Sequence, residues 1–158
     1  MQIIQATSPD EIAAVRRLFE EYAASLNVSL CFQNFSGELA GLPGAYAAPS
    51  GRLLLAVVDD SPVGCVALRP KEGRACEIKR LYVRSAHQGG GLGRHLVGAV
   101  IAEARDIGYT SVLLDTLPVM QKALRLYESF GFVRREAYYP TPVAGTVFME
   151  LRLEAEPE

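Results

Sequence analysis

The spacing of apolar residues changes abruptly in the middle of the chain, and this change limits the folds that the chain can adopt. Residues 52–58, 63–68 and 75–83 have the pattern of strands separated by short turns, which predicts an antiparallel meander. From Leu92 to Ala104 the apolar residues recur at helical spacing, and residues 111–114 then read as a buried strand. A strand, a helix and a strand in this order predict a crossover between parallel neighbours.

The segment before the meander predicts one strand, one helix and a long loop. Residues 2–6 alternate as a short strand, and Ser8 and Asp10 can cap a helix whose apolar stripe ends at Leu26. Residues 27–50 are irregular, with room for one short helix at 36–41. A loop of this length in a compact domain is often a binding loop.

The segment after the crossover predicts a last helix and a final hairpin. Asp115 and Thr116, followed by Pro118, are expected to begin a helix that stops at Gly131. Residues 132–138 and 146–153 read as two closing strands. The predicted fold class is therefore α/β (α+β), with a mixed, mostly antiparallel central sheet and helices on both of its faces.

Length and composition fit one folded domain that spans residues 1–158. The 158 residues are 49% hydrophobic and carry a formal net charge of -2, so they can bury one sizeable core. No apolar run approaches the roughly 18 residues that a membrane-spanning helix needs, and a membrane protein is excluded. The first residues show no secretory signal, so we expect a cytoplasmic protein.

Charge and cysteine content exclude two further classes of site. Sixteen basic and eighteen acidic residues give no overall field that would attract nucleic acid, so no nucleic-acid partner is expected. The spacing of Cys31, Cys65 and Cys76 matches neither a disulfide framework nor a metal-ligand motif. We interpret the three cysteines as small core residues and predict no metal site.

A glycine-rich turn, Gln-Gly-Gly-Gly-Leu-Gly-Arg at residues 88–94, is the most informative motif. Glycine lets the backbone approach a ligand closely, and the first turn of the following helix offers free N–H donors at its positive end. The turn therefore favours a phosphate or pyrophosphate ligand, with a merely flexible connection as the alternative. A nucleoside-triphosphate loop would need Gly-Lys-Ser or Gly-Lys-Thr, and the glycine spacing fits a dinucleotide fingerprint poorly.

What the turn does match is Gln-x-x-Gly-x-Gly, carried by Gln88, Gly91 and Gly93 after a strand that ends at Val83. This resembles the acetyl-coenzyme A loop of the GNAT superfamily of N-acetyltransferases. The segment Ala-Leu-Arg-Leu-Tyr-Glu-Ser-Phe-Gly-Phe at residues 123–132 is similar to a second signature of that family. Together the two motifs cover roughly residues 51–133 in register.

The resemblance implies that acetyl-coenzyme A is the donor and assigns residues to its two halves. The pantetheine arm would bond the backbone of the strand before the loop, at Leu81, Tyr82 and Val83, although ordinary strand packing also accounts for Leu81 and Val83. An amide near Val83 would polarise the thioester carbonyl. The pyrophosphate would be wrapped by the amides of Gln88, Gly89, Gly90, Gly91, Leu92, Gly93 and Arg94.

The resemblance also implies two catalytic residues for direct attack of an amine on the thioester. At pH 7 an alkylamine with a pKa near 10.4 needs roughly 4 to 5 kcal/mol to lose its proton, so a base or a water relay is required. Glu77 matches the family's glutamate base, with an exposed or salt-bridged strand glutamate as the alternative. Tyr127 matches the tyrosine that protonates the leaving thiolate, with a plain core tyrosine as the alternative.

One position departs from the family pattern. Many members carry asparagine seven residues before the tyrosine, where this chain has Met120, whose thioether cannot donate a hydrogen bond. Contact with the cofactor at this place must then be apolar or come from neighbours such as Gln121 or the turn of Asp115 and Thr116.

The acceptor is expected to be a small amine or an amino acid. In the family it is selected by the segment after the first helix and by the final hairpin, which here contribute mostly aromatic and apolar side chains and one close acid, Glu38. Those side chains are Phe32, Phe35, Leu42, Tyr46, Tyr138 and Tyr139. A polycationic amine would need several carboxylates, whereas Lys79 or Arg80 could bind an acceptor carboxylate.

Several alternatives stay open at this point. A peptide or protein acetyltransferase, acting on an N-terminus or a lysine, is the second hypothesis. A non-catalytic acyl-coenzyme A-binding module and a nucleotide-dependent enzyme are rivals from other classes. The edge strand of the C-terminal hairpin could also pair two copies into a homodimer.

Overall fold

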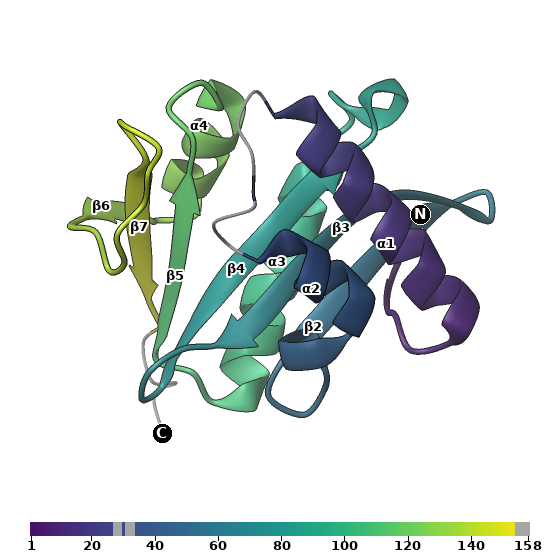
Figure 1. Cartoon of the computed structure of the whole chain (residues 1–158), viewed down its shortest axis with the longest axis horizontal. Coiled ribbons are helices and arrows are strands. Elements are labelled where there is room, and N and C mark those ends of the chain that lie inside the picture. Colours follow the sequence, from purple (N-terminus) through teal and green to yellow (C-terminus); the bar gives the residue numbers. More distant parts are fainter. Residues whose placement is uncertain (27–29, 31–33, 154–158) are drawn as a thin grey trace.

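A computed structural model of the chain shows one seven-stranded sheet in the order β1-β2-β3-β4-β5-β7-β6 (Figure 1). The structure describes residues 1–26, 30 and 34–153. The strands are β1 (Gln2–Gln5), β2 (Arg52–Val58), β3 (Ser61–Pro70), β4 (Ala75–Val83), β5 (Ser111–Thr116), β6 (Val133–Arg135) and β7 (Val147–Arg152). Every neighbouring pair is antiparallel except β4 and β5, which are parallel, so the predicted mixed sheet is confirmed.

Helices cover both faces of this sheet. In Figure 1, α1 (Pro9–Ser25) and α2 (Phe35–Gly41) lie in front of the strands and α3 (Leu92–Ile107) lies behind them. The core is accordingly split into two clusters, one under α1 and the turn η2 (Gly44–Tyr46), the other under α3 and α4 (Gln121–Ser129). None of the helices formed by the described residues is long and apolar enough to cross a membrane.

Local chemistry explains where α1 begins and where α3 ends. Ser8 caps α1 as predicted, because its Oγ accepts from the Glu11 amide at 3.2 Å while the Glu11 carboxylate accepts from the Ser8 amide at 3.0 Å. Helix α3 ends at Gly108, whose φ of 106° lies in the left-handed region that glycine adopts without strain.

The buried cysteines also behave as predicted, within the part of the chain that the structure describes. Cys65 and Cys76 are both free and fully buried. Burial raises the pKa of Cys76 to about 12, so its thiol stays protonated at neutral pH. Cys31 and Phe32 lie outside the described residues.

The C-terminal elements differ from the prediction in two ways. Asp115 and Thr116 end β5 instead of beginning a helix, and α4 starts only at Gln121. Strand β6 stops at Arg135 instead of running to residue 138. The reason lies a few residues further on, where Tyr138 and Tyr139 turn toward β4 and β5 and donate hydrogen bonds to carboxylates there.

Two irregularities in β4 shape the space above the sheet. Strands β4 and β5 pair only from Ala75 to Glu77 and then diverge, as Figure 1 shows. On its other side, β4 shifts register against β3 between the pairs at Tyr82 and Lys79, and Arg80 there has a φ of 61°. This β-bulge bends the strand beside the opening.

Candidate active site

A small cavity of about 50 Å³ lies where β4 and β5 diverge. We call it the inter-strand cavity. Residues from both faces of the sheet contribute to its wall, since Tyr22 comes from α1 and Tyr127 from α4. It is lined by residues 78–81 of β4, residues 115–117 at the end of β5, Tyr22 of α1, and Met120, Ala123 and Tyr127 at α4.

Tyr127 reaches this cavity from α4. Its side chain is 6% exposed, and its ring meets the Phe132 ring edge-on at a centroid distance of 5.6 Å. Burial raises the pKa of the phenol far above its ordinary value, so Tyr127 is protonated at neutral pH. A protonated phenol at the cavity wall can donate to a group that develops negative charge.

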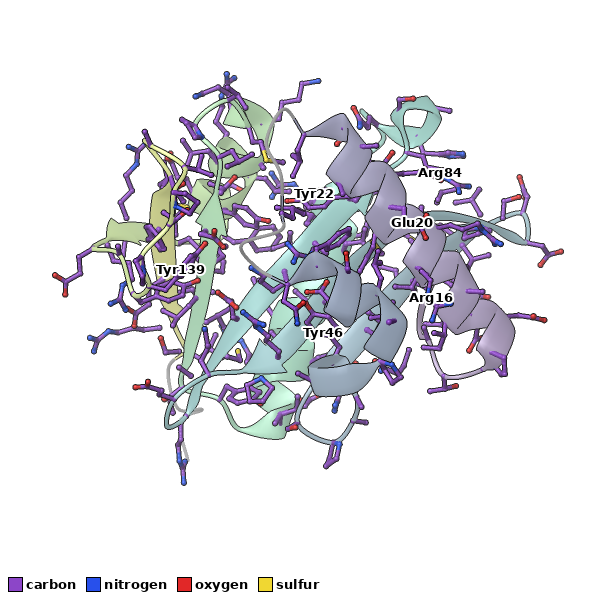
Figure 2. The ribbon with its side chains drawn as sticks, viewed as in Figure 1. Arg16, Glu20, Tyr22, Tyr46, Arg84 and Tyr139 are labelled. Atoms are coloured by element: carbon purple, nitrogen blue, oxygen red, sulfur yellow. The ribbon has the colours of Figure 1, made fainter. Side chains whose placement is uncertain are left out.

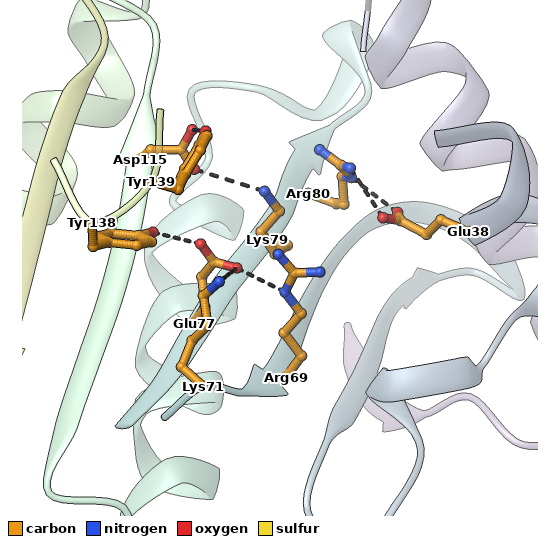
Figure 3. A network of polar contacts seen from close by, with 9 residues as sticks. All are labelled: Glu38, Arg69, Lys71, Glu77, Lys79, Arg80, Asp115, Tyr138 and Tyr139. Carbon is orange, nitrogen blue, oxygen red and sulfur yellow. Dashed lines mark hydrogen bonds and ion pairs between the residues drawn. The ribbon is translucent and has the colours of Figure 1, made fainter. Parts of the chain in front are cut away.

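A lysine and an aspartate face each other across the opening between the strands. The Nζ of Lys79 on β4 lies 3.7 Å from an Oδ of Asp115 on β5, and the hydroxyl of Tyr139 donates to the other Oδ at 2.5 Å (Figure 3). Burial lowers the pKa of Lys79, although Asp115 and Glu77 oppose that shift. Both members of the pair line the inter-strand cavity.

Glu77 lies further down β4, with a side chain that is completely buried. Its carboxylate accepts from Arg69 Nε at 2.7 Å and from the Tyr138 hydroxyl at 2.5 Å, and Lys71 Nζ lies at 4.0 Å. Burial alone would raise the pKa of Glu77, but Lys79, Arg69, Tyr138 and Lys71 together hold it below its ordinary value. Glu77 thus forms its salt bridge with Arg69 on β3 rather than with Lys79 or Arg80, its neighbours in sequence. It does not line the inter-strand cavity.

Arg80 lines the same cavity from the bulge in β4. Its guanidinium binds the Glu38 carboxylate through two hydrogen bonds of 3.0 Å, and it also stacks over the Phe35 ring at 5.2 Å. Lys79 and Arg80, which the sequence offered as alternatives beside Glu77, therefore both face the site. Each is already paired with a carboxylate of the protein.

The glycine-rich loop has the backbone that an anion site needs. Gly89 and Gly91 have φ angles of 87° and 84°, and no side chain caps the first turn of α3. The N–H groups of that turn have no partner within the helix and lie at its positive end. Gln88 holds the loop to β4 by donating from Nε2 to the Val83 carbonyl at 2.9 Å, whereas the Arg94 guanidinium stacks over Phe130 at 5.4 Å.

The end of β4 has the free edge that the resemblance implies. Leu81 lines the cavity, and from Ile78 onward β4 has no ladder with β5. Tyr82 and Val83 still pair with β3 through their other edge. An extended chain can add to such an unpaired edge as another strand would.

Around Met120, where many family members carry asparagine, the site is partly apolar. Met120 lines the cavity together with Asp115 and Thr116, whereas the Gln121 amide donates to the Pro118 carbonyl at 2.7 Å. Of the two sets of neighbours that could replace asparagine, the structure brings the β5 end to the cavity. The described residues form no group of three or more His, Cys, Asp or Glu that could hold a metal ion.

The structure thus brings Tyr127, Leu81 and the end of β5 to one cavity, whereas Glu77 is buried outside its wall. Sequence reasoning missed Tyr22, which fits the apolar stripe of the first helix as a packing residue, and Arg69, which nothing local distinguishes from a surface residue of a strand. It also treated Asp115 as part of a helix start. The one available signal for Asp115 was its place directly after a buried strand, where ligand-binding residues of α/β sheets gather.

Comparison with known proteins agrees with this geometry. The sequence matches the Acetyltransferase (GNAT) family over residues 12–132. It is 40% identical over 147 residues to an uncharacterized N-acetyltransferase of Schizosaccharomyces pombe, covering 92% of this chain and 90% of the relative.

Solved structures show the same fold. A putative acyl-CoA N-acyltransferase of Klebsiella pneumoniae has a TM-score of 0.69 at 28% identity, with 97% of this chain and 96% of that chain covered. A GNAT acetyltransferase of Staphylococcus aureus has a TM-score of 0.79 at 16% identity, with 97% and 99% covered. The chain therefore belongs to the GNAT family and is an acetyl-coenzyme A-dependent N-acetyltransferase.

Proposed function

We propose that this enzyme acetylates a small primary amine or an amino acid by direct attack of the amine on the thioester. The observation that carries the proposal is the inter-strand cavity, where an unpaired edge of β4 meets the protonated phenol of Tyr127. A peptide or protein amine is the second candidate for the acceptor. The alternative without catalysis is an acyl-coenzyme A-binding module.

The donor would lie along β4 and end at the glycine-rich loop. Leu81, Tyr82 and Val83 offer backbone groups to the pantetheine arm, and the amides of residues 88–94 offer donors to the pyrophosphate. This arrangement would leave the thioester at the inter-strand cavity, next to Tyr127. When the amine nitrogen bonds the carbonyl carbon, the C–S bond breaks and the thiolate takes the phenol proton.

The charges around the site favour an acceptor that is not a polycation. Four cationic side chains pair with three carboxylates in neighbouring but separate groups on this face of the sheet, as Figure 3 shows. The cations are Arg69, Lys71, Lys79 and Arg80, and the carboxylates are Glu38, Glu77 and Asp115. A polyamine or an aminoglycoside would meet repulsion there, whereas a single amine is tolerated.

We propose that Glu77 serves as the base through Tyr138. Because Glu77 is completely buried, a proton can reach it only through a neighbour, and the Tyr138 hydroxyl is hydrogen-bonded to it. The phenol oxygen would accept the proton that the amine loses while the phenol passes its own proton to Glu77. The lowered pKa of Glu77 keeps its carboxylate ionised, and so able to accept, at neutral pH.

The test is release of free thiol from acetyl-coenzyme A in the presence of separate amines. The panel holds amino acids, their amides, simple alkylamines, dipeptides and spermidine. We expect turnover with at least one small amine or amino acid and the poorest turnover with spermidine. Spermidine as the best acceptor would overturn the acceptor class, and binding of acetyl-coenzyme A without turnover on any amine would favour the binding module.

A further inference from the structure

A second cavity, of about 270 Å³, lies under α2 and the turn that follows it. We call it the α2 cavity. Its wall is formed by residues between Asn34 and Tyr46 and by Arg69, and Glu38, Tyr46 and Arg69 are among its polar residues. Figure 2 labels Tyr46 beside α2, on the face of the sheet that also carries Tyr22.

The buried hydroxyl of Tyr46 lies at this cavity and can donate a hydrogen bond to a ligand. Tyr46 is 2% exposed, and its ring packs edge-on against Phe19 at 6.2 Å. Its buried hydroxyl makes no hydrogen bond of normal geometry to a described residue, although burial and the nearby Glu38 carboxylate together raise the pKa of the phenol. A buried polar group without a partner is costly, so a ligand oxygen that accepts from this hydroxyl would gain more than an ordinary hydrogen bond.

Arg69 supplies positive charge to the same cavity. Its Nε donates to Glu77, and its side chain is still 33% exposed. A guanidinium has five N–H donors in a fixed fork, so one bond to Glu77 leaves the fork able to bind a second carboxylate. Tyr46 and Arg69 thus place a neutral and a charged donor at the wall of one cavity.

The α2 cavity adjoins the inter-strand cavity. Glu38 lines the α2 cavity and Arg80 lines the inter-strand cavity, and these two side chains bind each other at 3.0 Å. This ion pair therefore joins the wall of one space to the wall of the other. A molecule that occupies both must extend past this pair, so its two ends cannot be substituents of one carbon atom.

We propose that the α2 cavity binds a carboxylate of the acceptor, held by Arg69 and Tyr46, while the amine of the same molecule reaches the inter-strand cavity. The acceptor class is then an amine with a carboxylate several bonds away, as in an ω-amino acid or a short peptide. This inference rests on the proposed function and narrows it. It also moves carboxylate recognition from Lys79 and Arg80, whose side chains are 5% and 3% exposed, to Arg69, whose side chain is 33% exposed.

The experiment compares kcat/KM for 6-aminohexanoate with kcat/KM for its amide, 6-aminohexanamide. The two probes share the amine and the chain and differ only in the carboxylate. Glycine, β-alanine and 4-aminobutyrate extend the acid series to shorter spans. We expect the acid to exceed its amide at least tenfold and activity to rise from glycine to the longer acids.

Two variants test the assigned residues. Tyr46→Phe removes a hydroxyl without a described partner, so the free protein should be at least as stable as the wild type, and the acid-to-amide ratio should fall at least fivefold. In Gly41→Leu the added side chain starts in open space at the cavity wall and should lower the same ratio by occupying the cavity. Tyr109→Phe is the matched control, because the Tyr109 hydroxyl bonds the Ser50 carbonyl and lines neither cavity; its ratio should equal that of the wild type.

The possible results separate the two proposals. Equal kcat/KM for acid and amide, or a Tyr46→Phe ratio equal to that of the wild type, would overturn the carboxylate site and leave the acetyltransferase proposal standing. If no amine is acetylated, the small-amine function fails, and the site is judged from the thermal shift that each probe gives in the presence of coenzyme A. A shift with 6-aminohexanoate that exceeds the shift with its amide, and that Tyr46→Phe abolishes, would support the site; equal shifts would overturn it.

Discussion

Arg80 on β4 and Glu38 on α2 are joined by two hydrogen bonds, Nε to Oε2 and Nη2 to Oε1, each 3.0 Å long. The Arg80 side chain is 3% exposed and that of Glu38 is 13% exposed, so the pair is largely shielded from water. Helix α2 has no fully buried residue of its own. The pair therefore contributes strongly to holding α2 over the sheet and to shaping the walls of both cavities.

We expect Glu38→Gln to destabilise the protein by about 3 kcal/mol, because it leaves a buried guanidinium without its counter-charge. Urea denaturation of the variant and the wild type measures this difference. Glu72→Gln is the matched control, since Glu72 is exposed, and it should change stability by less than about 0.5 kcal/mol. Equal stability of Glu38→Gln and Glu72→Gln would show that the pair does not anchor α2.

In the glycine-rich loop, Gly91→Ala should weaken acetyl-coenzyme A binding more than Gly90→Ala. Gly91 has a φ of 84°, which costs an alanine about 1 kcal/mol or more, whereas Gly90 is not in the left-handed region. A Cβ would meet no atom within 4 Å at either position, so the backbone conformation alone separates the two variants. Calorimetric titration with acetyl-coenzyme A measures both affinities, and a Gly90→Ala affinity as low as that of Gly91→Ala would contradict the assignment.

Much of the fold could be predicted because the local sequence signals agree with the strands, helices and turns that the folded structure contains. Strands β2 and β4 and helix α3 have the predicted bounds to within a few residues. The turn at Asp59 and Asp60 has positive φ at both residues, a conformation that aspartate tolerates better than most side chains. Periodicity and turn chemistry act within a few residues, so a sequence displays them directly.

The contacts that close the site were not predictable, because they join distant segments. Tyr138 reaches Glu77 and Tyr139 reaches Asp115 across 61 and 24 residues, and these bonds end β6 earlier than its alternation predicts. The bulge at Arg80 also has no local signal, since arginine rarely adopts positive φ. It depends on the pairing of β4 with β3 and of Arg80 with Glu38.

At the cavity, Tyr127→Phe should lower kcat at least tenfold while leaving the affinity for acetyl-coenzyme A nearly unchanged. The phenol is protonated and lines the inter-strand cavity, so the variant loses the proton donor but keeps the ring that packs on Phe132. Steady-state kinetics with the best amine and calorimetric titration measure the two quantities. A kcat equal to that of the wild type would remove Tyr127 from the acid role.

Glu77 and Tyr138 should behave as one unit if Tyr138 carries the proton to Glu77. We expect Glu77→Gln and Tyr138→Phe each to lower kcat/KM at least tenfold, and the double variant to be no slower than the slower single one. Tyr109→Phe serves as the control for loss of a tyrosine hydroxyl. Additive losses would show that the residues act independently, and wild-type rates in Tyr138→Phe would exclude the relay.

The acid side of the stability profile tests the charge state of Glu77 separately from catalysis. Lys79, Arg69, Tyr138 and Lys71 outweigh burial and hold the pKa of folded Glu77 below its ordinary value of 4.5. Ionised Glu77 therefore stabilises the fold above about pH 4.5, and this contribution disappears as the pH falls through the lowered pKa of the folded state. The Glu77→Gln variant has no carboxylate to protonate at this position. Its free energy of unfolding should therefore fall less than that of the wild type between pH 6 and pH 3. Urea denaturation over this range, with Glu72→Gln expected to follow the wild type, makes the comparison; parallel curves for Glu77→Gln and the wild type would show that Glu77 titrates normally in the folded protein.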